Sequence, residues 1–360
     1  MKTKRMDEIQ ALRGWAFLGV FLHHAAFYFD WGYVGVSAFF VLSGFFATIR
    51  PGGDERIPSP FDSIKKALQK TLRLYPLHIV MLCMITPLVM EGVIYSWQLR
   101  PVAKQFLLNV FLLQSWSPDH YDNISFNGVT WFLSTMMFLY IVIPYFAYFV
   151  RRHDKRISLL IAIVTMLIQT AACVVYLKKY GIDNINFDWF SYVFPPAHLL
   201  DTFVGCVLGK IYLESKDEEQ EQRSVKATLY ELVLLIATGI FYYWMEQPEE
   251  NIVMAALKNR TVLYILPACL WIWVFIKQKG YISKALSIKP FKWLGDMSGD
   301  LYLVHFVVIQ YIWDQLTKHH IRFKTAGRPL LSVSGLAVSV LICIVVKILR
   351  DIMKRSRSKV

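Results

Sequence analysis

Long apolar segments recur from one end of this chain to the other, and they restrict its fold more than any other feature. A helix needs about 20 mostly apolar residues to cross a bilayer, and we find about ten such segments. Backbone in lipid must satisfy its own hydrogen bonds, and the continuous apolar runs lack the alternating pattern of a barrel strand. We therefore predict an all-α polytopic membrane helix bundle with about ten transmembrane helices. The predicted spans are 11–29, 33–50, 76–96, 129–150, 157–177, 195–213, 228–246, 260–277, 298–316 and 330–349.

Basic residues gather in short segments that join alternate pairs of spans. The formal net charge is +13, and most of the excess falls on one side of the bundle if ten spans are right. The positive-inside rule makes that side cytoplasmic, so we expect both termini in the cytoplasm. The charge also favours membrane lipid and anionic cofactors, and we expect no nucleic-acid partner. The basic segments are 1–5, 50–73, 151–156, 277–292 and 354–360, with 318–328 as an exception on the opposite side.

The chain shows no internal repeat and no appended soluble domain. We interpret residues 1–360 as one membrane domain with a flexible basic tail at 350–360. The five cysteines lie apart in apolar segments without CxxC spacing, which argues against a disulfide framework and a zinc site. His319 and His320 are adjacent loop residues, and two adjacent histidines alone do not form a metal site. We therefore expect no metal cofactor.

An arginine and a histidine lie within the first predicted span. Ionisable groups are costly in hydrocarbon, so Arg13 and His24 are candidate functional residues by default. At about 100° per residue, their separation places both on one helix face, roughly 16 Å apart along the axis. A cation at one membrane surface and an imidazole far inside suit a ligand with an anionic head and a long arm ending in a reactive group. The alternatives are a snorkelling cation and a histidine bonded to a neighbouring helix.

Four further segments combine small, aromatic and polar residues: 35–46 (GVSAFFVLSGFF), 73–76 (RLYP), 127–134 (NGVTWFLS) and 294–305 (LGDMSGDLYLVH). Together with the Arg and His of the first span, and in this order, the set resembles the acyltransferase-3 family of integral membrane acyltransferases. That family shows an FFVLSGF-like second helix, an Arg-x-Tyr-Pro element, an Asn-Gly-x-x-Trp-x-Leu-Ser stretch and a late LGxxSxxxYLxH element. The resemblance covers nearly the whole chain.

The resemblance implies transfer of an acyl group, most often acetyl, from acyl-coenzyme A inside the cell to a hydroxyl. The acceptor would be a surface glycan or its lipid-linked precursor, and the protein a multi-pass enzyme of the inner membrane. His24 is then the candidate general base or nucleophile. His305 is a second candidate catalytic residue, as proton acceptor, acceptor-positioning group or oxyanion-side donor. Arg13 and Arg73 are candidates for binding the coenzyme A phosphates, because Arg suits bidentate phosphate contacts.

Asn127 and Trp131 are candidate substrate-binding residues on the acceptor side. Asn127 has the stronger claim, because it would sit at the outer membrane face where an acceptor sugar arrives. The chain also departs from the family pattern at three places, one of which is Asp300, where a Tyr is common. Residues 135–137 (TMM) stand where many members carry a Glu pair, and His198 with Asp201 matches only in part an Arg and Glu of a middle helix. These departures leave the acceptor open.

Two functions of other classes stay open. A secondary transporter or flippase is compatible with about ten helices that bury charge, although the paired repeats with broken helices that favour transporters are not found. A non-catalytic membrane partner or sensor that kept the fold is favoured slightly by the missing Glu pair. The choice between an acylated His24 and a general base stays open as well, as do the acyl group and the oligomeric state.

Overall fold

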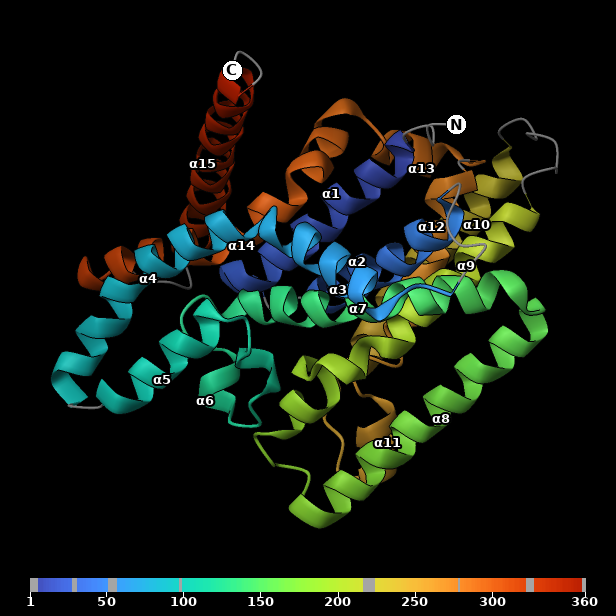
Figure 1. Cartoon of the computed structure of the whole chain (residues 1–360), viewed down its shortest axis with the longest axis horizontal. Coiled ribbons are helices and arrows are strands. Elements are labelled where there is room, and N and C mark those ends of the chain that lie inside the picture. The colour runs from blue at the N-terminus through green and yellow to red at the C-terminus, as the bar shows by residue number, and fades with distance from the viewer. Residues whose placement is uncertain are drawn as a thin grey trace.

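The computed structural model describes residues 6–27, 31–50, 57–96, 99–215, 224–277, 279–321 and 327–357. Every element in these ranges is helical, which confirms the all-α prediction, and each predicted span coincides with a helix (Figure 1). The expected basic segment 1–5 lies outside the described residues. The helices at the predicted spans are α1 (Asp7–Leu22), α2 (Trp31–Ile49), α4 (Tyr75–Ser96), α7 (Trp131–Arg152), α8 (Lys155–Tyr180), α9 (Leu199–Glu214), α10 (Val225–Met245), α12 (Ile265–Lys277), α14 (Lys289–Lys318) and α15 (Arg328–Arg357).

Shorter helices and helical turns connect these elements. The short α-helices are α3 (Pro60–Leu72), α5 (Leu99–Val110), α6 (His120–Asn123), α11 (Ile252–Leu257) and α13 (Tyr281–Leu286). The π or 3-10 turns are η1 (His23–Phe27), η2 (Gln114–Trp116), η3 (Gly128–Thr130), η4 (Trp189–Val193) and η5 (Pro195–His198).

Several helices are suited to cross a membrane. Among the described residues, five are long and apolar enough to do so, namely α2, α7, α8, α10 and α15. The number rises to six if α3 and α4, which meet at a bend of 50°, form one broken span. The chain is therefore a multi-pass membrane protein. The count of ten spans and the cytoplasmic position of the termini stay predictions.

Helix α3 lies where the sequence analysis expected only a basic connecting segment. Its small residues Ser63, Ala67 and Thr71 recur every fourth position and are buried, and the helix packs against α7. Phe61 and Leu68 are exposed on another face. A basic helix with an exposed apolar face is typical of a segment that lies in the membrane interface. We interpret α3 as such a helix.

The centre of the bundle depends on close helix crossings through glycine. A Cβ built on Gly295 of α14 would lie 1.7 Å from the carbonyl oxygen of Gln10 on α1, and one on Gly14 would lie 2.2 Å from the carbonyl oxygen of Phe291. Gly44 of α2 and Gly205 of α9 make a similar crossing. Small residues let helix backbones approach this closely, because no side chain separates them. Helices α1, α2, α9 and α14 therefore form a tightly packed centre (Figure 1).

Helix α15 runs to Arg357, so the stretch that we expected as a flexible tail begins as helix. Near its end, Arg350 forms an ion pair with Asp300 of α14, with 2.6 Å between Nη1 and Oδ2. This pair joins the last two long helices of the chain.

The α1–α14 crossing gives a stability prediction. We expect Gly295→Ala to lower the unfolding temperature of the detergent-purified protein by about 5 °C or more, because the added methyl group meets backbone that cannot yield. Gly239→Ala is the matched control, since a Cβ at Gly239 of α10 meets no atom within 4 Å. Equal unfolding temperatures for the two variants would contradict the close crossing.

Candidate active site

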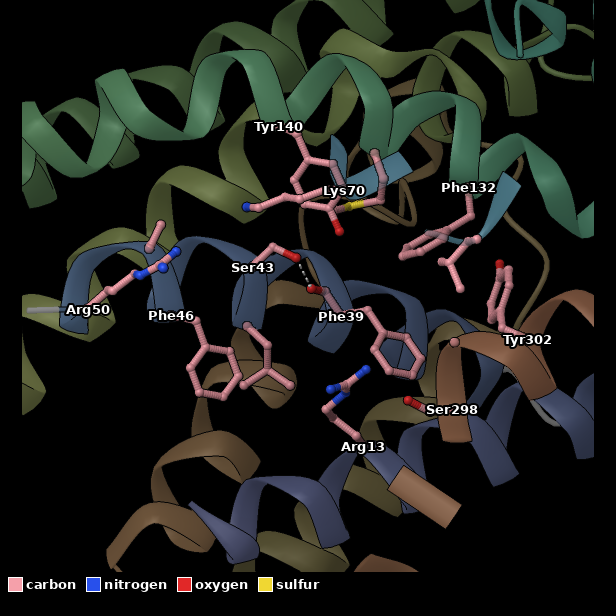
Figure 2. Close-up of a pocket in the computed structure, with 15 residues that line it drawn as sticks. Arg13, Phe39, Ser43, Phe46, Arg50, Lys70, Phe132, Tyr140, Ser298 and Tyr302 are labelled. Atoms are coloured by element: carbon pink, nitrogen blue, oxygen red, sulfur yellow. Dashed lines mark hydrogen bonds between the residues drawn. The ribbon is translucent and has the colours of Figure 1, made fainter. Parts of the chain in front are cut away.

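A pocket of about 340 Å³ opens between five helices (Figure 2). Its wall combines cations, aromatic rings and small polar side chains. Most lining residues come from α1, α2, α3, α7 and α14, and two come from the connecting residues just after α2 and α3. They are Arg13, Phe39, Leu42, Ser43, Phe46, Ala47, Arg50, Lys70, Leu74, Phe132, Met136, Tyr140, Ser298, Gly299 and Tyr302. We call this cavity the basic pocket.

Three cations line the basic pocket, and no Asp or Glu is among its described lining residues. Arg50 and Lys70 lie toward one end, and the Arg13 guanidinium points into the space from α1 (Figure 2). Lys70 Nζ lies 4.4 Å from the ring centroid of Tyr140. Asp296 lies within electrostatic range of Arg13 and offsets part of this charge. The pocket therefore has the electrostatic character of an anion-binding site.

Arg73, which we expected beside Arg13, has a different position. It lies at the break between α3 and α4, and its side chain is exposed. It does not line the basic pocket, although it is within electrostatic range of Arg13. Arg73 is therefore near Arg13 but does not line the basic pocket.

His24 lies in a π turn, not in the α-helix that the sequence predicts. Helix α1 ends at Leu22, and the chain continues as η1. The prediction of one continuous α-helix from Arg13 to His24 is therefore wrong for the last two residues, which belong to η1. π turns are rare and are frequent at functional sites. The partly buried His24 ring lies 5.4 Å from the His305 ring and 5.3 Å from the Phe306 ring, measured between centroids.

His305 is fully buried in α14, and its hydrogen bond defines its tautomer. Nδ1 lies 3.1 Å from the Leu301 carbonyl oxygen, which accepts only, so Nδ1 carries a hydrogen. The neutral ring then has a bare lone pair on Nε2, which has no hydrogen-bond partner among the described residues. Phe17 packs edge-on against this ring at 5.7 Å. The two predicted histidines thus form a close pair, and one of them presents an unused acceptor.

Asn127 holds the loop before α7 against α14. Its Nδ2 donates to the Leu303 carbonyl oxygen at 2.8 Å, and its side chain is fully buried. A Cβ on the next residue, Gly128, would lie 3.6 Å from the ring of Phe306. Asn127 is therefore beside the histidine pair but points to backbone. This geometry suits a positioning residue.

A polar network stabilises the segment before Asn127. Asn109 Nδ2 donates to Ser125 Oγ at 2.8 Å. Lys104 donates to the buried carboxylate of Asp122 at 2.5 Å, and this hydrogen bond raises the pKa of Lys104. Because buried polar groups without partners are costly, these bonds limit the conformations open to the loop.

Trp131 belongs to a buried aromatic cluster beside the basic pocket and does not itself line it. Its ring stacks on His198 at 5.7 Å and contacts Tyr192 at 4.9 Å. His198 Nδ1 lies 2.9 Å from Asp201 Oδ2, and His198 Nε2 donates to the Tyr192 carbonyl oxygen at 2.6 Å. Both His198 and Asp201 are fully buried. This pair has the geometry of a structural hydrogen bond between helical segments.

The positions that depart from the family pattern have varied surroundings. Thr135 Oγ1 donates to the Val193 carbonyl oxygen at 3.3 Å, whereas Met136 lines the basic pocket. No group of three or more His, Cys, Asp or Glu residues within the described ranges is placed to hold a metal ion.

Of the residues that line the basic pocket, the sequence singled out Arg13 alone as a site residue. Phe132 and Tyr302 lie inside the quoted motifs but were not singled out, and Arg50 and Lys70 were counted only as loop charges. Small residues at every fourth position of 63–71 were the available signal, because that spacing predicts a helix and brings Lys70 to a defined face.

The family model for the acyltransferase domain Acyl_transf_3 matches residues 6–348. The chain belongs to the acyltransferase-3 family. This confirms the resemblance and makes the protein a membrane acyltransferase.

The relatives are distant. The acyltransferase MdmB of Streptomyces mycarofaciens is 23% identical over 86% of this chain and 80% of its own length. The peptidoglycan O-acetyltransferase OatA of Listeria monocytogenes is 23% identical over 85% of this chain. A putative peptidoglycan O-acetyltransferase of Bacillus subtilis is 22% identical over 84% of it. The chain spans about half the length of these last two relatives. No solved structure matches the chain significantly.

The buried His198–Asp201 pair gives a second stability prediction. Asp201→Ala leaves His198 buried without its partner, and loss of one member of a buried pair costs about 3–5 kcal/mol. We expect a clear fall in the unfolding temperature of the purified acyltransferase. Lys155→Met is the control, because Lys155 and Glu214 form an exposed pair whose loss costs about 0–1 kcal/mol. Similar small shifts for both variants would contradict a structural role for the buried pair.

Proposed function

We propose that this protein is an inner-membrane O-acyltransferase, with acetyl as its acyl group. It moves the group from cytoplasmic acetyl-coenzyme A to a hydroxyl of a cell-surface glycan or a lipid-linked precursor. One observation carries the proposal: α1 brings Arg13 to a basic pocket that α14 also lines, and η1, which continues α1, brings His24 close to the buried His305 of α14. The O-acetyltransferase relatives support the same reaction class.

The basic pocket suits the donor. Coenzyme A carries several phosphates and a long thin arm that ends in a thioester. Arg13, Arg50 and Lys70 would contact the phosphates, since charge-assisted bonds from Arg are the strong ones at such groups. The basic connecting segments support a cytoplasmic position for this end, by the positive-inside rule. Arg73, exposed at the α3–α4 break, would assist by attracting the anion toward the entrance.

The histidine pair suits the chemistry. A neutral imidazole of His24 takes the proton of the acceptor hydroxyl while that oxygen forms the new ester bond. The carbon–sulfur bond of the thioester breaks, and the proton passes to the departing thiolate. His305 Nε2 would accept a hydrogen bond from His24, which leaves the other His24 nitrogen bare for the acceptor. The same pair would serve if His24 itself attacked the thioester.

The acceptor would approach from the side of Asn127. We propose Asn127 as a positioning residue, because it contacts the α14 backbone between Tyr302 and His305 and no atom of its side chain is exposed. Trp131, which is 8% exposed, would form part of the wall behind this loop.

The catalytic role of His24 is tested by mutation. We expect His24→Ala to reduce acetyl transfer from acetyl-coenzyme A to isolated cell-wall glycan by about 100-fold or more, as for loss of a general base. Radiolabelled acetyl groups on the glycan provide the measurement. His319→Ala is the control, since His319 is an exposed residue at the end of α14. Full activity of His24→Ala with normal insertion would rule out the catalytic role, and tracer flux without donor would favour a transporter.

The phosphate-binding role of Arg13 gives a separate prediction. We expect Arg13→Ala to raise the KM for acetyl-coenzyme A by about 10-fold or more, because a hydrogen bond to a charged group contributes about 1.5–3 kcal/mol. The KM for S-acetylpantetheine, which lacks the nucleotide phosphates, should change little. Arg152→Ala, at the exposed end of α7, is the control. An equal loss with both donors would show that Arg13 does not bind the phosphates.

A further inference from the structure

Three aromatic rings from three helices meet at one end of the basic pocket. Phe39 comes from α2, Phe132 from α7 and Tyr302 from α14 (Figure 2). The ring centroids lie 6.1 Å apart for Phe39 and Phe132, 6.4 Å for Phe39 and Tyr302, and 4.9 Å for Phe132 and Tyr302. Each ring therefore contacts the other two. We call these three residues the aromatic barrier.

The aromatic barrier links the basic pocket to the histidine pair. All three of its rings line the basic pocket, whereas His24 and His305 do not. The Tyr302 ring also contacts the His305 ring, with 5.8 Å between centroids. Tyr302 thus lines the pocket and touches the histidine pair as well. We infer that a group bound among the cations reaches His305 past Tyr302.

Two of the three helices that carry the rings are held by close crossings with other helices. Gly44 of α2 lies directly against α9, and Gly295 of α14 lies directly against α1. On the third helix, α7, Phe132 also contacts Phe40 of α2, with 4.7 Å between ring centroids. Because interiors are close-packed, we expect an opening to come from rotation of the ring side chains. A small opening is therefore easier to form than a wide one.

We propose that the aromatic barrier determines the size of the acyl group, so that acetyl passes and longer acyl chains are rejected. This inference rests on the proposed function, because it assumes that a thioester enters the basic pocket and reacts at the histidine pair. A two-carbon acyl group needs only a slight rotation of Phe132 and Tyr302. The pantetheine arm fills this opening once the acyl carbon reaches the histidine pair, so each further methylene needs space beside His305 that the Tyr302 and Phe17 rings already fill. Removing the Phe132 ring, which packs on Tyr302, would let Tyr302 withdraw from that space.

The test compares donors of different chain length. Initial rates are measured with acetyl- and butyryl-coenzyme A for the full-length enzyme in proteoliposomes and for Phe132→Ala. We expect the wild type to favour acetyl, and Phe132→Ala to raise the butyryl-to-acetyl ratio of kcat/KM by about 10-fold or more, which corresponds to about 1.4 kcal/mol. Phe39→Leu, on a different helix and with much of the volume kept, should raise the ratio by less. If Phe132→Ala does not fold, the ratio for Phe39→Leu tests the inference in its place.

Phe146→Ala is the matched control. Phe146 lies on the same helix as Phe132 but outside the basic pocket, where it packs on Phe203 at 5.3 Å. Its ratio should equal that of the wild type. A ratio that is unchanged in both barrier variants, or folded barrier variants that transfer neither acyl group, would overturn the inference while leaving the proposed function intact. A wild type that transfers neither group would contradict the proposed function itself, and the inference with it.

Discussion

Direct backbone contact between α1 and α14 is the constraint on which the candidate site depends. Gly14 and Gly295 leave no room for side chains where the helices cross, so the crossing has one register. That register places Arg13 and Ser298 together in the basic pocket and, where the chain continues from α1 into η1, places His24 beside His305 of α14. Residues nearly the whole chain apart are thereby aligned along one path. A looser crossing would not define which residues face each other.

The cost of polar groups in a membrane separates structural residues from candidate functional ones. His198 uses both ring nitrogens, one toward Asp201 and one toward the Tyr192 carbonyl, so its presence is explained by packing between helical segments. His305 differs, because its Nε2 has no hydrogen-bond partner among the described residues. The cations of the basic pocket have only partial partners: Asp296 offsets part of the Arg13 charge and Lys70 lies over the Tyr140 ring, but no carboxylate is among the described lining residues. Such groups are expected where a substrate supplies a further partner.

The sequence predicted the helical class, the position of each long helix and the residues of the histidine pair. Arg13 and His24 were found because charge in an apolar segment is conspicuous, and His305 because it ends a motif. Residues that act through tertiary placement were not found. Lys70 reaches the basic pocket only because α3 folds back against α7, and the exposed Arg73 was expected in its place. The π turn at His24 was missed as well, because no residue type in that segment specifies it.

A donor bound in the basic pocket must extend past the aromatic barrier to react at the histidine pair. A structure of the enzyme bound to a non-hydrolysable acetyl-coenzyme A analogue would show whether it does. We expect phosphates against Arg13 and Lys70, with the acyl end beyond the displaced Tyr302 ring and within reach of His24. A nucleotide bound elsewhere, or an acyl end directed away from both histidines, would contradict this expectation.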